Sequence, residues 1–214
     1  MDQAEILPDF LVRRHHARRA GLTPEEHAKR SELVRKGQSP AAMIIACCDS
    51  RVSVADVFGP DMGEFFVHRN IANLVPPCTE DGSQHGTSAT IEFAVTVLGV
   101  RHVVVMGHSS CGGVAGCYDA HSGGSASLGG FTAAWLDILA PSVAPIASQD
   151  LDREDAHRAL EYEAVLVSLR NLMTFPFVRE AVEKGALTLH GAWRDIGDAS
   201  MRHYDPASGK FVPV

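Results

Sequence analysis

Two short apolar runs in this chain lead directly into clusters of metal-binding residue types, and this pattern constrains the fold more than any other feature. Residues 43–46 (MIIA) run into 47–51 (CCDSR), and residues 103–106 (VVVM) run into 107–113 (GHSSCGG). Short, continuously apolar runs are typical of parallel strands covered on both faces. Ligands of open α/β sheets bind beyond the carboxyl ends of the strands. A sheet that places these two strands side by side therefore brings both clusters together.

Two further runs, 65–67 (FFV) and 187–189 (LTL), have the same character. Between the runs 65–67 and 103–106, residues 87–98 carry apolar side chains at helical spacing: Ile91, Ala94, Val95 and Leu98. Alternation of strand, helix and strand is typical of parallel sheets with helical crossovers. The sequence therefore predicts an α/β fold with a mainly parallel central sheet flanked by helices.

Glycine and proline residues indicate where the remaining elements begin and end. Residues 152–173 read as a long helix that Pro176 ends, and 123–130 (GGSASLGG) read as a loop. The last 25 residues contain Gly, Asp and Pro at intervals, which predicts a strand and turns over one edge of the sheet.

The first 36 residues read as a separate helical arm. Thr23 is a helix cap, Pro24 occupies the first helical position, Glu26 completes a capping box, and Gly37 stops the helix. A basic cluster precedes this helix, at Arg13, Arg14, Arg18 and Arg19. These arginines form either a solvated helix face or a clasp on a second subunit.

Composition excludes several classes of protein. Lys and Arg number 19 and Asp and Glu number 26, so the net charge of −7 disfavours nucleic-acid binding. The chain has no run of 18 apolar residues, so no transmembrane helix is expected. The N-terminal residues lack the apolar core of a secretory signal. We therefore expect a cytoplasmic protein, in which five cysteines serve as metal ligands or free thiols rather than as a disulfide framework.

The two clusters contain the ligands of a zinc site. One cysteine of the 47–51 cluster, together with His108 and Cys111, forms a Cys₂His set, and soft thiolates with an imidazole suit Zn²⁺. Three protein ligands leave one tetrahedral position open, as in catalytic zinc sites. The CxxC pair that commonly helps to build a closed structural site is absent from the sequence.

The pattern alone does not choose between Cys47 and Cys48. Neighbouring side chains of a strand point to opposite faces, so both cannot face one metal ion without distortion. The remaining cysteine is expected to behave as a small buried hydrophobe, as are Cys78 and Cys117.

Several motifs resemble those of the β-class carbonic anhydrases, in particular the plant-type branch. Residues 47–52 (CCDSRV) match the family's C-x-D-S-R motif, and 108–113 (HSSCGG) match its H-x-x-C-G-G motif. Residues 65–77 (FFVHRNIANLVPP) are similar to its RN-x-A-N segment. The resemblance covers roughly residues 25–214 and implies a catalytic zinc-binding α/β domain over 37–214, after an arm over 1–36.

The resemblance implies that Cys47, His108 and Cys111 bind Zn²⁺. It also implies a zinc-dependent lyase (a carbonate dehydratase), in which zinc-bound hydroxide converts carbon dioxide to bicarbonate and a proton. Asp49 is expected to orient the proton of the attacking water, and Arg51 is expected to keep Asp49 ionised through a charge-assisted pair. Cys111 is expected to open a helix, whose N-terminus favours a thiolate and lowers its pKa.

The resemblance also assigns three substrate-binding positions. Gln38 matches a substrate-site glutamine, and Phe66 and Ile71 fall where the family lines an apolar carbon dioxide pocket. A fourth position is Gly112, because glycines let the backbone approach the metal closely and its amide is then expected to face bicarbonate. In this family the site lies at a dimer interface, so Gln38 and Phe66 are candidates to serve a neighbouring subunit. The implied assembly is a homodimer or a higher homo-oligomer.

Three alternatives remain open on the sequence. Relatives of the family hydrolyse carbonyl sulfide or carbon disulfide with the same motifs. A non-catalytic zinc module used for assembly is a second alternative, although the complete pair of Asp49 and Arg51, together with Gln38, disfavours it. A thiol redox protein is a third and weaker one, because the usual CxxC is missing. The sequence does not select the residue that passes the product proton to buffer. The candidates are His15, His16, His27, His68, His85, His157 and His203.

Overall fold

The computed structural model describes residues 5–59, 62–124 and 128–214 and divides the chain into two compact units, Met1–Gln38 and Ser39–Val214. The first unit contains α1 (Asp9–Ala20) and α2 (Pro24–Lys36), and neither helix buries a residue. The predicted capping box is confirmed, because Thr23 Oγ1 accepts the Glu26 N–H at 3.2 Å and Glu26 Oε2 accepts the Thr23 N–H at 2.8 Å. Gly37 ends α2 with a φ of 80°.

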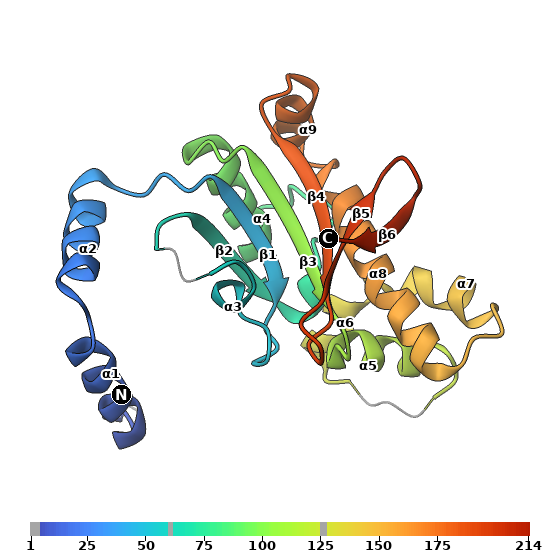
Figure 1. The fold of residues 1–214 in the computed structure, drawn as a ribbon. Helices are drawn as coiled ribbons and strands as arrows, with labels where there is room; N and C mark the ends of the chain where they lie inside the picture. Colours follow the sequence, from blue (N-terminus) through green and yellow to red (C-terminus); the bar gives the residue numbers. More distant parts are fainter. Residues whose placement is uncertain (1–4, 60–61, 125–127) are drawn as a thin grey trace. The chain divides into compact units, whose positions relative to one another are not determined.

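The second unit is built on a six-stranded sheet with the order β2-β1-β3-β4-β5-β6 (Figure 1). Four strands run parallel: β1 (Ala42–Cys47), β2 (Phe65–Asn70), β3 (His102–His108) and β4 (Thr188–Arg194). An antiparallel ribbon of β5 (Met201–Asp205) and β6 (Lys210–Pro213) extends the sheet beyond β4. The predicted mainly parallel α/β sheet is therefore confirmed, with β1 and β3 adjacent.

Alternate side chains of the strands enter two different hydrophobic clusters. Met43 and Ile45 of β1 pack with side chains of α4 (Gly86–Glu92), the π-helical turn η2 (Phe93–Val97), α8 (Arg153–Leu172) and α9 (Pro176–Glu183). Ile44 and Ala46 pack on the opposite face with side chains of α3 (Val54–Phe58). Both faces of β1 are buried as predicted, whereas β2, at the edge of the sheet, leaves Val67 43% exposed.

A third cluster lies where the parallel strands end. It joins residues of α5 (Gly112–His121), α6 (Gly130–Leu136), α7 (Val143–Ala147) and α8, and it includes Cys47, Cys111 and Cys117. The short turns η1 (Ile71–Asn73) and η3 (Ala140–Ser142) complete the chain path in this region. In the described part of the chain, no single helix is long and apolar enough to cross a membrane, and only the bent pair 130–136 and 140–147 reaches that length and composition together.

The structure corrects four local predictions. The helix predicted over 87–98 is divided between α4 and η2. Pro176 does not simply end the long helix, because α8 stops at Leu172 and Pro176 opens α9, where a residue without an N–H is tolerated. Gly130 belongs to α6 rather than to the predicted loop, of which residues 125–127 lie outside the described residues. The C-terminal residues form two strands instead of one.

Candidate metal centre

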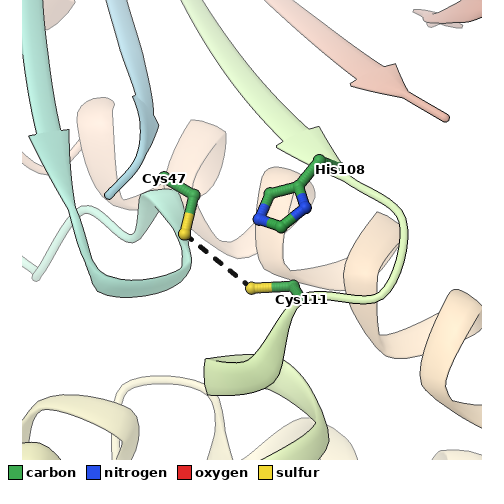
Figure 2. A group of neighbouring side chains, drawn as sticks. All are labelled: Cys47, His108 and Cys111. Atoms are coloured by element: carbon green, nitrogen blue, oxygen red, sulfur yellow. Dashed lines mark hydrogen bonds between the residues drawn. The ribbon is translucent and has the colours of Figure 1, made fainter. Parts of the chain in front are cut away.

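Three predicted ligands meet at the carboxyl end of the sheet. Cys47 is the last residue of β1, His108 is the last residue of β3, and Cys111 directly precedes α5. Their ligand atoms lie within 4.8 Å of one another, and the two Sγ atoms are 3.9 Å apart. Figure 2 shows the three side chains pointing toward one another. All three residues are buried.

The structure separates the two adjacent cysteines. Cys47 is 4% exposed and faces the ligand group, whereas Cys48 is exposed. Consecutive side chains that leave a strand on opposite faces account for this difference. The expectation that the second cysteine behaves as a buried hydrophobe is therefore wrong for Cys48. It holds for Cys117, which is fully buried, and only partly for Cys78, which is half-buried.

The imidazole of His108 is oriented for metal binding. Its Nδ1–H donates to the Ser109 carbonyl oxygen at 2.9 Å, which leaves the lone pair on Nε2. His108 Nε2 is buried and has no hydrogen-bond partner among the described residues. A buried polar atom without a partner is costly, and a metal ion removes that cost. The donor set of two thiols and this nitrogen therefore fits Zn²⁺.

The two thiols share a hydrogen bond, with 3.9 Å between their sulfur atoms. A hydrogen bond from the Cys111 thiol lowers the pKa of Cys47, and the same neighbour together with burial raises the pKa of Cys111. The amides of Gly113 and Val114 at the start of α5 act to lower the Cys111 pKa, as the sequence predicts, but the opposing effects outweigh them. A divalent cation between the sulfur atoms favours the thiolate form of both.

Asp49 and Arg51 form the predicted bidentate pair. Arg51 Nε donates to Asp49 Oδ1 at 2.9 Å, and Arg51 Nη2 donates to Asp49 Oδ2 at 2.7 Å. Arg51 Nη2 also donates to the Ser110 carbonyl oxygen at 3.0 Å. The guanidinium holds the pKa of Asp49 well below its usual range. Because the Asp49 N–H lies 3.4 Å from Cys47 Sγ, this pair adjoins the ligand group.

The two glycines after Cys111 differ in their surroundings. A Cβ on Gly113 would lie 2.8 Å from Cγ2 of Ile71, whereas a Cβ on Gly112 would meet nothing within 4 Å. Only Gly113 is therefore required for the close approach of α5 to η1.

We expect Gly113→Ala to destabilise the protein by about 1–3 kcal/mol, because the added methyl group forces α5 away from Ile71. Gly112→Ala is the matched control, and it is expected to be neutral or to stabilise the helix by up to about 1 kcal/mol. Urea denaturation of both variants measures the difference. Equal midpoints for the two variants would show that the contact with Ile71 is not limiting.

Two cavities are lined by chain neighbours of the ligands, Cys48 in one and Ser109 and Ser110 in the other. One of about 460 Å³ is lined by Ile71, Cys48, His68 and Trp135, among others, and Trp135 Nε1 donates to the Ile71 carbonyl oxygen at 2.8 Å. The other, of about 540 Å³, lies on the side of Arg51 and is more polar. Ile71 thus lines a cavity, and its role in substrate binding stays a prediction.

The other substrate-binding positions lie in different settings. Phe66 packs against Phe93, with ring centroids 5.9 Å apart, beside the core cluster under the sheet. Gly112 is exposed at the start of α5. Gln38 is the last residue of the first unit and is exposed. The roles of these three residues in substrate binding stay predictions.

Sequence reasoning missed two residues that contact the site. Trp135 reaches Ile71 from 64 residues away, and no local pattern marks it. Glu161 is buried on α8, where Oε1 accepts the Cys111 N–H at 3.1 Å. A carboxylate directly after Leu160 in the apolar stripe of a helix is a detectable signal, because an acidic side chain is rarely buried without a partner.

Comparison with known proteins gives a consistent family. The sequence model of the family described as "Carbonic anhydrase" matches residues 42–201. β-carbonic anhydrase 3 of Arabidopsis thaliana is 40% identical over 179 residues, which cover 82% of this chain and 65% of that protein. Mitochondrial β-carbonic anhydrase 6 of the same organism is 33% identical over 216 residues, which cover 97% of this chain and 72% of that protein.

Solved structures agree with these sequence matches. The β-carbonic anhydrase CcaA superposes with a TM-score of 0.85 at 27% identity, over 95% of this chain and 98% of that one. A structure from a study of two tetrameric β-carbonic anhydrases of Sordaria macrospora superposes with a TM-score of 0.75 at 29% identity, over 91% and 94% of the two chains. The chain belongs to the β-carbonic anhydrase family.

Proposed function

We propose that this chain catalyses the reversible hydration of carbon dioxide to bicarbonate and a proton, with zinc held by Cys47, His108 and Cys111. One observation carries the proposal. Two thiols and an unpartnered imidazole nitrogen lie together in a buried place, beside a carboxylate that an arginine keeps ionised. Membership of the β-carbonic anhydrase family supports the same reaction.

Cys47, His108 and Cys111 would hold the zinc ion, and three protein ligands are the number typical of catalytic zinc sites. When bound, zinc supplies the Lewis acidity that makes water a nucleophile near neutral pH. The hydrogen bond from His108 Nδ1 to the Ser109 carbonyl oxygen keeps the ring in the tautomer that ligation requires.

Asp49 orients the nucleophile in this proposal. Its ionised carboxylate accepts a hydrogen bond from the attacking water, so that an oxygen lone pair is directed at the carbon of carbon dioxide. Arg51 acts through Asp49, because its two parallel hydrogen bonds hold the carboxylate in one orientation and keep it charged. Arg51 is therefore a positioning residue.

Carbon dioxide is small and apolar, and the cavity of about 460 Å³ is the better candidate for its approach. Ile71 and Trp135 supply apolar wall there, whereas the cavity on the side of Arg51 is lined mainly by polar and charged side chains. The amide of Gly112, an exposed residue, is the proposed donor to bicarbonate.

We also propose that the protein is a homo-oligomer in which Gln38 and the arm serve a second copy. Residues 1–38 contain 8 Lys and Arg against 6 Asp and Glu, a net charge of +2, whereas residues 39–214 contain 11 against 20, a net charge of −9. Opposite charges on the two segments favour docking of one copy's arm on another copy. The tetrameric assembly named for the Sordaria macrospora proteins supports the same view.

The test of the proposed function is a stopped-flow assay of carbon dioxide hydration with a pH indicator, together with the zinc content of the same purified sample. We expect one zinc per chain and rapid hydration that is lost when a chelator removes the metal and restored when zinc is returned. Carbonyl sulfide is assayed in parallel as a competing substrate. A zinc-loaded protein that does not accelerate hydration would contradict the proposal.

A further inference from the structure

Glu161 is the only acidic residue among the described residues that is buried, with 4% of its surface exposed. Both carboxylate oxygens accept N–H donors. Oε1 accepts the backbone N–H of Cys111 at 3.1 Å, and Oε2 accepts the indole Nε1–H of Trp193 at 3.1 Å. Burial raises the pKa of this carboxyl group. Burying a carboxylate is costly unless its oxygens accept hydrogen bonds, and both oxygens of Glu161 do.

These two hydrogen bonds connect three separate elements at the ligand group. Glu161 lies on α8, Trp193 lies on β4, and Cys111 lies in the turn between β3 and α5. The Cys111 peptide is the point from which its Sγ projects toward Cys47 Sγ, 3.9 Å away. Fixing that peptide therefore fixes the position of one thiol relative to the other two ligands.

A neutral side chain of the same shape cannot satisfy both donors. A glutamine has one acceptor oxygen and one NH₂ group, so it can accept from either Cys111 or Trp193 but must face the other with a donor. A carboxylate accepts from both. Two converging N–H donors therefore account for an acidic residue at this buried position.

We propose that Glu161 is a positioning residue of the zinc site, which holds the Cys111 peptide, and so the Cys111 thiolate, in the geometry that binds zinc. Trp193 in turn holds the carboxylate. This inference rests on the proposed zinc site. It goes beyond it by assigning part of the metal affinity to a side chain that does not touch the metal.

The first test compares zinc affinity in the full-length protein. Glu161→Gln is expected to weaken zinc binding by about 10–100-fold, the usual cost of losing a hydrogen-bond partner behind a metal ligand. Competition for zinc with a chromophoric chelator measures this affinity. The thiolate-to-metal absorption of the cobalt-substituted variant is expected to shift, because the Cys111 sulfur moves. Ser168→Ala is the matched control, since Ser168 is fully buried on the same helix and bonds the Asn73 carbonyl oxygen instead of the ligand group.

A rescue experiment separates positioning from general stability. In Glu161→Gln/Trp193→Phe the competing indole donor is gone, so the glutamine oxygen is free to accept the Cys111 N–H. This double variant is expected to regain most of the zinc affinity and the wild-type cobalt spectrum. Glu161→Met/Trp193→Phe has a similar volume but no strong acceptor, and it is expected to stay weak. The comparison of these two variants decides the question even where Glu161→Gln alone does not fold.

The proposal is overturned when Glu161→Gln lowers the melting temperature as Ser168→Ala does but leaves zinc affinity and the cobalt spectrum unchanged. It is also overturned when the two double variants bind zinc equally well. These outcomes are distinct from failure of the proposed function. In that case the wild-type protein itself binds no zinc, or binds zinc without hydrating carbon dioxide.

Discussion

Cys47→Ala is expected to lose its zinc and its carbon dioxide hydration together, whereas Cys48→Ala is expected to keep one zinc per chain. Structural zinc sites with four ligands bind the metal with about 10–16 kcal/mol, which is roughly 2.5–4 kcal/mol for each ligand. Loss of one thiolate is therefore expected to weaken zinc binding by about 3 kcal/mol or more. Cys47 lies in the buried ligand group and Cys48 is exposed. Elemental analysis after dialysis, paired with the stopped-flow assay, measures both effects.

This pair of variants is well matched because the two cysteines are neighbours and the substitution is the same. His108→Ala and Cys111→Ala are expected to behave as Cys47→Ala does, since each removes one ligand of the same group. Zinc retained in Cys47→Ala but lost from Cys48→Ala would reverse the assignment of the ligand.

Asp49→Ala is expected to keep its zinc and to lower turnover by about 100-fold or more, the usual contribution of a group that handles a proton in the reaction. Arg51→Ala is expected to lower turnover as well, because Asp49 then loses the partner that orients it. Since Arg51 acts through Asp49, the double variant is expected to be no slower than Asp49→Ala alone. Stopped-flow turnover and zinc content are measured for all three proteins.

Arg158→Ala is the control for loss of an arginine near the same cavity. Arg158 lines the cavity beside Arg51 but pairs with Glu154 on the surface, so its removal is expected to leave turnover unchanged. Full turnover in Asp49→Ala would remove Asp49 from the mechanism. Additive losses in the double variant would show that Arg51 has a role of its own.

Local sequence patterns were sufficient to predict the frame of the fold. The runs at 43–46 and 103–106 lie in the adjacent parallel strands β1 and β3, and Thr23 and Glu26 form the capping box that their spacing indicates. These features depend on residues close together in the chain. The break between α4 and η2 depends on packing that the local pattern does not contain. Pro176, in contrast, is a local signal that fits a helix start as well as a helix end, and the structure places it at the start of α9.

The ligand group was partly predictable for a similar reason. The ends of neighbouring parallel strands must meet, so Cys47 and His108 had to come close once β1 and β3 were adjacent. The hydrogen bond between Glu161 and Cys111 joins residues 50 positions apart, and that from Trp135 to Ile71 joins residues 64 apart. No spacing rule identifies such pairs. The cytoplasmic location stays a prediction.

X-ray absorption at the zinc edge of the purified, zinc-loaded protein tests the central claim most directly. We expect two sulfur ligands at about 2.3 Å and two nitrogen or oxygen ligands at about 2.0–2.1 Å, as two thiolates, one imidazole and one exchangeable water require. A shell of four sulfur atoms, or one without sulfur, would contradict a catalytic site built from Cys47, His108 and Cys111.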